Sequence, residues 1–179
     1  MNYQDILDFW FNPEQQPNWF AKSNNFDVLI EKKFKELHQQ ACQSELWTWR
    51  SSAERRLAEI IVLDQFSRNL YRDSPHAFAQ DAMALALAQE TVAQGLDRNL
   101  APVQRSFLYM PYMHSESAKI HQIGLELFEQ LGNPINLEFE KKHKVIIDRF
   151  GRYPHRNKVL GRTSTTEELE FLTQPNSSF

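Results

Sequence analysis

A basic segment in the C-terminal part of the chain contains the densest group of side chains that could do chemistry. Residues 141–162 hold eight lysines or arginines but a single acid, Asp148. Arginine binds phosphate or carboxylate through two parallel hydrogen bonds, so this composition predicts a site for an anion. The alternative is that the arginines pair with acids such as Asp64, Asp81 and Glu116 and hold helices together. The candidate ligand-binding residues are Arg68, Arg72, Arg105, Arg149, Arg152 and Arg156.

An upstream segment repeats part of this pattern. Residues 64–72 and 148–156 both read Asp-x-Phe-x-Arg-x-x-x-Arg, and each copy follows an aliphatic run. Charged side chains this close to core-forming residues must be paired or hydrogen-bonded. We therefore predict that the two segments build one polar site, in which Asp64 and Asp148 occupy equivalent places and each is engaged by an arginine.

A second candidate group, His114-Ser115-Glu116, follows Pro111. Because proline interrupts a helix, we expect a break or kink there and expect the tripeptide to open the next helix, where free backbone N–H groups favour anions. A histidine beside a carboxylate can also transfer protons near neutral pH. The candidate catalytic residues are therefore His114, Glu116 and His155. In the alternative interpretation, Ser115 caps the helix and Glu116 receives an arginine.

No metal and no cofactor are predicted, and whether the chain is an enzyme stays open. The histidines that could surround a metal, His114, His143 and His155, lack the i, i+4 pair on one helix that makes such a site convincing. Cys42 is the only cysteine, which excludes an intrachain disulfide and a thiolate-rich metal site. The sequence also lacks the nucleophile-elbow motif of many serine hydrolases.

The composition is that of an ordinary soluble domain. The chain has 179 residues, 41% of them hydrophobic, and a formal net charge of −3. This is enough for a core and gives no general attraction to nucleic acid or to membranes, so we predict neither as a partner. The first residues do not form a secretory signal and no apolar run could span a membrane, so we expect a cytoplasmic protein. The expected domain covers residues 1–172, followed by a flexible tail at 173–179.

Helix signals recur along the chain, whereas strand signals do not. Candidate N-caps precede apolar residues at helical spacing, and glycine or proline ends most of these stretches. The sequence has no Asn-Gly or Asp-Gly turn and no clear alternating run of β-branched residues. We expect an all-α fold of about seven or eight helices in antiparallel hairpins. The expected helix starts are at Asn2, Asn24, Ser51, Ser74-Pro75, Pro102, Asn133-Pro134 and Thr165.

Several longer motifs resemble a bacterial family known as domain of unknown function 924. These motifs are residues 6–11, 63–69, 104–107, 109–116, 149–157 and 160–162, and together they extend over nearly the whole chain. The resemblance implies a TPR-like helical fold, a right-handed array of helix pairs. It implies no established activity.

Two functions fit these observations. In the first, an Arg/His/Glu-lined polar pocket binds an anionic small molecule, either a phosphate or a carboxylate. In the second, a TPR-like scaffold binds a protein or peptide partner, and the polar motifs are internal ion pairs. Arginines that converge on an open cavity would favour the first function, and arginines used in ion pairs would favour the second. The oligomeric state stays open. The pocket is expected to contain Arg105, His114, Glu116, Arg149, Arg152 and His155.

Overall fold

The structure is a computed structural model, and it describes residues 1–178 of the chain. In this range the chain forms α-helices, short 3₁₀ segments and one π-helical turn at Val62–Phe66, without β-strands, which confirms the predicted all-α fold. Two 3₁₀ segments, Pro75–Ala77 and Pro154–Arg156, lie beside the candidate site described below. The α-helices are α1 (Tyr3–Trp10), α2 (Asn24–Cys42), α3 (Ala53–Ile61), α4 (Ser67–Leu70), α5 (Asp81–Ala93), α6 (Pro102–His114), α7 (Ala118–Leu131), α8 (Pro134–Phe150) and α9 (Thr166–Leu172).

Most helix ends follow local capping signals. The side chains of Asn2, Asn133 and Thr165 accept backbone N–H groups at the starts of α1, α8 and α9, as the sequence predicts. The caps of α2 and α3 are Ser23 and Ser52, each one residue away from the expected position. These caps satisfy N–H groups that have no partner inside the helix, so the ends of these helices are set by neighbouring residues.

Helix α6 passes through Pro111 and ends at His114, so Pro111 does not break the helix. Proline costs a helix interior about 3 kcal/mol because it lacks one N–H group and crowds the preceding turn. Packing against α3, α5, α7 and α8 holds α6 together despite this cost. His114 therefore closes a helix instead of opening one, and α7 begins only at Ala118, after Glu116. The anion-favouring helix start expected at His114 is not formed.

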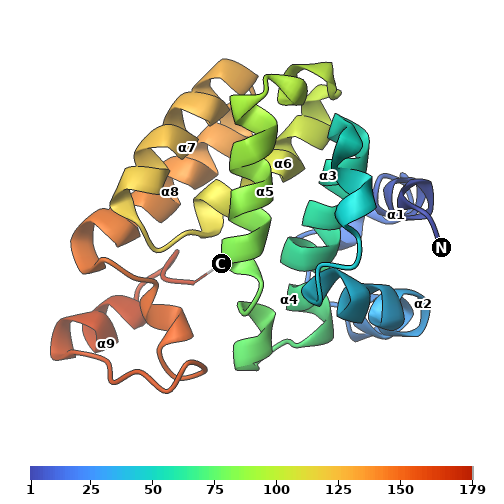
Figure 1. Cartoon of the computed structure of the whole chain (residues 1–179). Coiled ribbons are helices and arrows are strands. Elements are labelled where there is room, and N and C mark those ends of the chain that lie inside the picture. Colours follow the sequence, from blue (N-terminus) through green and yellow to red (C-terminus); the bar gives the residue numbers. More distant parts are fainter. Residues whose placement is uncertain (179) are drawn as a thin grey trace.

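The helices form two groups with α5 and α6 between them. In Figure 1, α1 to α4 lie on one side of the molecule and α7 and α8 on the other. Helix α6 packs against α3, α5, α7 and α8, which places it at the centre. The short connections at residues 115–117 and 132–133 join α6, α7 and α8 into packed neighbours, the antiparallel hairpins that short connections produce.

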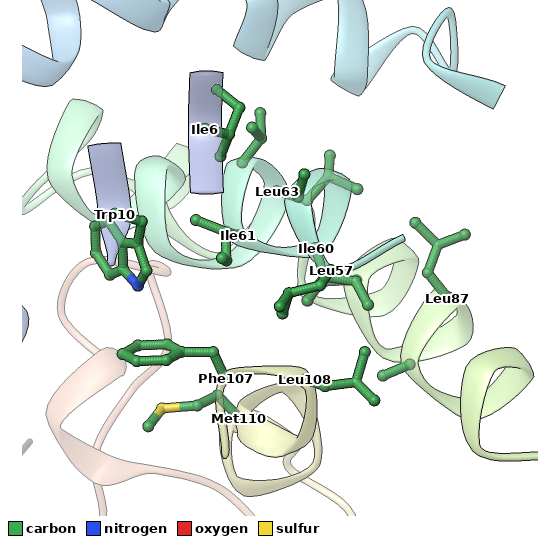
Figure 2. Close-up of a cluster of buried hydrophobic side chains, with 14 of the residues drawn as sticks. Ile6, Trp10, Leu57, Ile60, Ile61, Leu63, Leu87, Phe107, Leu108 and Met110 are labelled. Atoms are coloured by element: carbon green, nitrogen blue, oxygen red, sulfur yellow. The ribbon is translucent and has the colours of Figure 1, made fainter. Parts of the chain in front are cut away.

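The main core lies where α1, α3, α5 and α6 meet. Figure 2 shows these helices contributing side chains to one apolar cluster, with Leu63 of the π-helical turn among them. The end of α3 and the turn after it are fully enclosed, so the polar side chain of Asp64 in this turn must find its partners inside the protein. The labelled core residues are Ile6, Trp10, Leu57, Ile60, Ile61, Leu63, Leu87, Phe107, Leu108 and Met110.

The described chain continues for a few residues after α9. Ser177 is buried, and its hydroxyl donates a hydrogen bond to the carbonyl of Leu172 at 3.2 Å. Phe179, the last residue of the tail that was predicted to be flexible, lies outside the described residues. Over residues 1–178, every helix is too short or too polar to cross a membrane.

Candidate functional site

The polar site is centred on Asp64, which lies in the π-helical turn between α3 and α4. Its carboxylate is fully buried and accepts hydrogen bonds from Gln65 Nε2 at 2.6 Å, Arg68 Nη1 at 3.1 Å and His114 Nδ1 at 2.7 Å. Burial by itself would raise the pKa of Asp64. The charge of Arg68 and the hydrogen bonds from His114 and Gln65 hold that pKa well below its usual range. Asp64 is therefore a buried carboxylate anion.

The π-helical turn brings this carboxylate to its partners. Such a turn inserts an extra residue into a helix and is frequent at functional sites. The Ser67 hydroxyl donates to the carbonyl of Leu63 at 2.5 Å and lies 2.7 Å from Nε2 of His38 in α2. Because the Ser67 proton is used on Leu63, the ring of His38 must donate to the Ser67 oxygen. Helix α2 is thereby bonded to the turn that contains Asp64.

Arg68 joins Asp64 to Asp81 at the start of α5. Its Nη1 and Nη2 atoms donate to the two carboxylate oxygens of Asp81 at 2.9 and 3.0 Å, and Nη1 also reaches the backbone oxygen of Asp64 at 2.8 Å. The predicted pair of Asp64 with Arg68, one helical turn later, is confirmed. Because the Arg68 guanidinium is hydrogen-bonded to both carboxylates, Arg68 links α4 to α5.

His114 lies at the end of α6 beside the same cluster. An ionised Asp64 only accepts hydrogen bonds, so Nδ1 of His114 carries the hydrogen and Nε2 of the neutral ring is left as a proton acceptor. Burial and the charge of Arg68 lower the pKa of His114, against the opposing effect of Asp64. The side chain keeps 14% of its surface exposed. An accessible imidazole that a buried carboxylate orients has the geometry of a general base.

Arg156 is the arginine of this cluster whose hydrogen-bonding capacity is used least. Its side chain is buried, and its guanidinium lies over the rings of Phe78 and Tyr153, 4.5 Å from each ring centroid. Within residues 1–178, Nη1 donates to Asp81 at 3.4 Å, and the buried Nε has no acceptor. Burial and the neighbouring charge of Arg68 lower the pKa of Arg156. The rings stabilise the cation but leave N–H groups available for a ligand.

Glu116 fixes the segment that contains Arg156. It accepts the backbone N–H of Tyr153 at 2.7 Å and both terminal nitrogens of Arg162 at 2.6 and 2.9 Å. The Tyr153 hydroxyl donates to the carbonyl of Met113 at 2.5 Å. These bonds attach residues 153–162 to the end of α6 and to the connection between α6 and α7. Glu116 thus pairs with an arginine, which agrees with the alternative interpretation of the sequence in which Glu116 receives one.

A cleft of about 380 Å³ opens over this cluster. The start of α5, the end of α6 and the segment around Arg156 all contribute to its wall. The apolar part of the wall includes Phe78, Leu85 and Leu160. The cleft therefore combines an apolar surface with several ionised side chains. The charged or polar residues that line it are Asp81, His114, Ser115, Glu116 and Arg156.

The structure brings part of the predicted site together at this cleft. His114, Glu116 and Arg156 line the cleft, and Arg68 supports them through Asp81. His155, the neighbour of Arg156 in sequence, does not line the cleft, and its buried Nδ1 has no partner in the described part of the chain. Burial lowers the pKa of His155 to about 4, so this ring is neutral at pH 7.

The remaining predicted arginines do not line the cleft. Arg105 donates to the backbone carbonyls of Arg98 and Leu100. The other three form the internal ion pairs that a scaffold interpretation expects. The single pocket that was expected to include Arg105, Arg149 and Arg152 is therefore not formed. The ion pairs are Arg72 with Asp27, Arg149 with Glu167 and Arg152 with Glu168.

The two copies of the Asp-x-Phe-x-Arg pattern lie in different environments. The side chain of Asp148 is 47% exposed and pairs with Lys144 one turn earlier in α8. The prediction that Asp148 matches Asp64 and is engaged by an arginine is wrong. Asp148 faces solvent, whereas the π-helical turn directs Asp64 toward the core, and a shared local sequence pattern does not encode this difference in burial.

Sequence reasoning missed a second buried pair, which lies next to Ser115 and Tyr153. His121 of α7 and Glu140 of α8 are both fully buried, with Nδ1 and Oε1 2.7 Å apart. The His121 Nε2 atom lies 2.8 Å from the carbonyl of Ser115 and 3.1 Å from the Tyr153 hydroxyl. His121 and Glu140 each lie in an amphipathic helix that also contains many other polar residues. The hydrophobic periodicity of the sequence therefore did not single them out as a buried pair. Among residues 1–178, no three His, Cys, Asp or Glu side chains are grouped in a way that could hold a metal ion.

The fold and this cluster define an all-helical protein with a buried Asp–His–Arg network at the edge of a cleft. A family model described as "Bacterial protein of unknown function (DUF924)" matches residues 6–176, and the chain belongs to this family. The chain is also similar to the solved structure of a protein of unknown function, ATU0120, from Agrobacterium tumefaciens. The two are 36% identical over 95% of this chain and 96% of that chain, with a TM-score of 0.90. No match was found among curated proteins.

Proposed function

We propose that the cleft binds an anionic small molecule, with Arg156 as the cation that contacts it and His114 as the group that exchanges a proton with it. The main support is the state of Arg156. A buried guanidinium usually has its N–H groups bonded, because an unsatisfied buried donor costs about 1–3 kcal/mol. Arg156 has one long hydrogen bond, to Asp81, within the described residues and a buried Nε without an acceptor. An anion in the cleft would supply acceptors.

The position of Asp81 supports the same assignment. Asp81 is held through both of its oxygens by Arg68, and the bond from Arg156 to Asp81 is longer than either of these. Arg156 is therefore the cation that could turn to a ligand without leaving Asp81 unpaired. The neighbouring His114 adds a base, because its Nδ1 is used by Asp64 and its Nε2 is left to accept a proton.

The alternative function, a TPR-like scaffold for a protein or peptide, has support from other residues. Arg72, Arg149 and Arg152 form internal ion pairs, as helix-joining arginines would. These pairs explain how the helices are held together, but they give no indication of a binding partner. The under-used donors of Arg156 lie at a cleft and favour the small-molecule site, so the scaffold is the second candidate.

A thermal-shift experiment with the purified full chain tests the proposal. We expect a panel of small phosphates and carboxylates, compared at constant ionic strength, to contain anions that raise the melting temperature, because a ligand that binds the folded state stabilises it. We expect Arg156→Met to lose this rise. Methionine keeps an apolar chain beside Phe78, and Asp81 stays paired with Arg68, so the variant should fold, which circular dichroism checks.

Arg149→Met is the matched control for this experiment. It removes one positive charge from the same part of the chain, but its partner Glu167 is exposed and neither residue lines the cleft. The control should keep the full anion-dependent rise. A rise that persists in Arg156→Met, or a panel in which no anion stabilises the wild-type chain, would overturn the proposed function.

A further inference from the structure

The wall of the cleft combines a few charged or polar side chains with a larger apolar surface. Phe78, Leu85 and Leu160 line it together with prolines and alanines, and Arg156 and His114 are among its charged or polar residues. Ligand sites of this kind hold an apolar body and use a few polar groups for orientation. A small, fully charged ion would leave the apolar wall in contact with water, but a ligand with an apolar body would cover it.

The charges around the cleft already balance without a ligand. Three carboxylates and three guanidinium groups form the network, while His114 is neutral. A dianion would add two uncompensated negative charges to a partly buried site, which is costly. A monoanion would add one, and a proton on His114 would compensate it. The members of the network are Asp64, Asp81, Glu116, Arg68, Arg156 and Arg162.

The surroundings of His114 allow this protonation once a ligand is present. Without a ligand, burial and Arg68 keep the ring neutral, and Asp64 stabilises its Nδ1–H. A carboxylate on the Nε2 side would place a second negative charge next to the ring and favour its protonated form. The charged or titratable groups around His114 are Asp64 of the π-helical turn, Arg68 of α4, Asp81 of α5, Glu116 of the connection to α7, His143 of α8 and Arg156 of the segment after α8.

We infer that the ligand is a monocarboxylic acid with an apolar body. Its carboxylate binds Arg156 beside a protonated His114, and its body packs against Phe78, Leu85 and Leu160. This inference rests on the proposed function, because it names the class of anion that the same cleft binds.

The first test compares four probes at constant ionic strength: acetate, hexanoate, hexanamide and inorganic phosphate. Each buried methylene contributes about 0.8 kcal/mol, or about fourfold in affinity, so hexanoate should bind at least about tenfold more tightly than acetate. Hexanamide has the same length without the charge and should bind weakly. Phosphate has the charge without the apolar body and should also bind weakly. Isothermal titration calorimetry gives the four affinities.

A pair of leucine variants separates the apolar wall from the rest of the surface. Leu160→Asn should reduce hexanoate affinity toward that of acetate and leave acetate affinity unchanged. Leu169→Asn is the control, because Leu169 is an exposed leucine of α9 that does not line the cleft. Equal loss of hexanoate affinity in both variants would contradict packing of the ligand body against Leu160.

Proton uptake is the second readout. Titration of hexanoate near pH 7 in two buffers with different ionisation enthalpies should show uptake of up to one proton per ligand. We expect His114→Gln, which can still donate to Asp64, to abolish this uptake while Arg156 still binds the ligand more weakly. Binding of hexanoate without any proton uptake would overturn the role of His114.

The outcomes also separate this inference from the proposed function. If phosphate binds more tightly than hexanoate and Arg156→Met abolishes that binding, the anion site stands and the monocarboxylate inference fails. If hexanamide binds as tightly as hexanoate, the site binds the apolar chain without using the charge. In that case both the monocarboxylate inference and the proposed anion-binding function fail. If none of the four probes binds, both fail as well.

Discussion

His114 and Asp64 lie fifty residues apart in the chain, and a 2.7 Å hydrogen bond joins Nδ1 of the histidine to Oδ1 of the aspartate. The bond connects the end of α6 to the π-helical turn that follows α3. It fixes which nitrogen of His114 is available to the cleft. It also makes Asp64 the buried group on which both His114 and Arg68 depend.

We predict that Asp64→Ala destabilises the fold strongly. The change leaves His114 Nδ1 without its acceptor and removes one of the two carboxylates that neutralise Arg68. Breaking a buried ion pair in this way costs about 3–5 kcal/mol, which a urea titration at neutral pH would measure. Asp148→Ala is the control, because Asp148 occurs in the same sequence pattern but is exposed, and it should stay within about 0.5 kcal/mol of wild type. Asp64→Ala with wild-type stability would refute the central role of Asp64.

We predict that stability falls as the pH is lowered from about 6.5 toward 4. Burial lowers the pKa of His38 to about 4 and that of His143 to about 3, whereas both rings titrate near 6.5 in the unfolded chain. The unfolded state therefore binds more protons in this window, and acidification favours it. Each ring contributes up to about 1.4 kcal/mol per pH unit. Urea titrations across the window measure the slope, and a free energy of unfolding that stays constant or rises on acidification would contradict the assignment.

We predict that Gly124→Ala destabilises the protein although it lies inside α7. Alanine normally stabilises a helix interior by about 1 kcal/mol relative to glycine. Here a Cβ atom would lie 3.1 Å from Glu140 Oε1 and 3.2 Å from Tyr112 Cβ. Neither neighbour can move easily, since Glu140 is buried and bonded to His121, and Cβ of Tyr112 is fixed to its helix. We expect a net loss of about 1–3 kcal/mol.

The control for Gly124→Ala is Gln122→Ala, an exposed position of the same helix. It should change the free energy of unfolding by no more than about 0.5 kcal/mol. Thermal or urea denaturation compares the two variants. A Gly124→Ala variant that is more stable than wild type would show that α7 has room to move away from α6 and α8.

We predict that Glu116→Gln loosens residues 153–162 without unfolding the protein. Arg162 and the backbone N–H of Tyr153 both donate to this carboxylate and hold its pKa below its usual value against the effect of burial. The neutral amide loses the charge that pairs with Arg162. Hydrogen–deuterium exchange should become faster in 153–162 and stay unchanged in α1 to α4. Glu167→Gln, which removes an exposed partner of Arg149, should not alter exchange at 153–162.

The helical class and most helix ends were predictable from the sequence because they depend on near neighbours. Asn133 and Thr165 cap the helices that follow them, and Gly151 adopts the left-handed conformation, φ 67°, that ends α8. The pair of Asp64 with Arg68 was also predictable, since residues four apart meet on one face of a helix. The family resemblance rested on such local motifs as well.

Tertiary packing decided the composition of the site. Arg156 meets Asp81 from 75 residues away, and periodicity in the sequence assigns no partner over such a distance. Tertiary packing also explains why Pro111 does not break α6. Contacts on several sides keep the helix intact past a residue that locally favours a break. Asp64 and Asp148 share a sequence pattern, but only the fold buries one and exposes the other. Burial determines which charged side chains must find a partner, and burial is a property of the assembled helices.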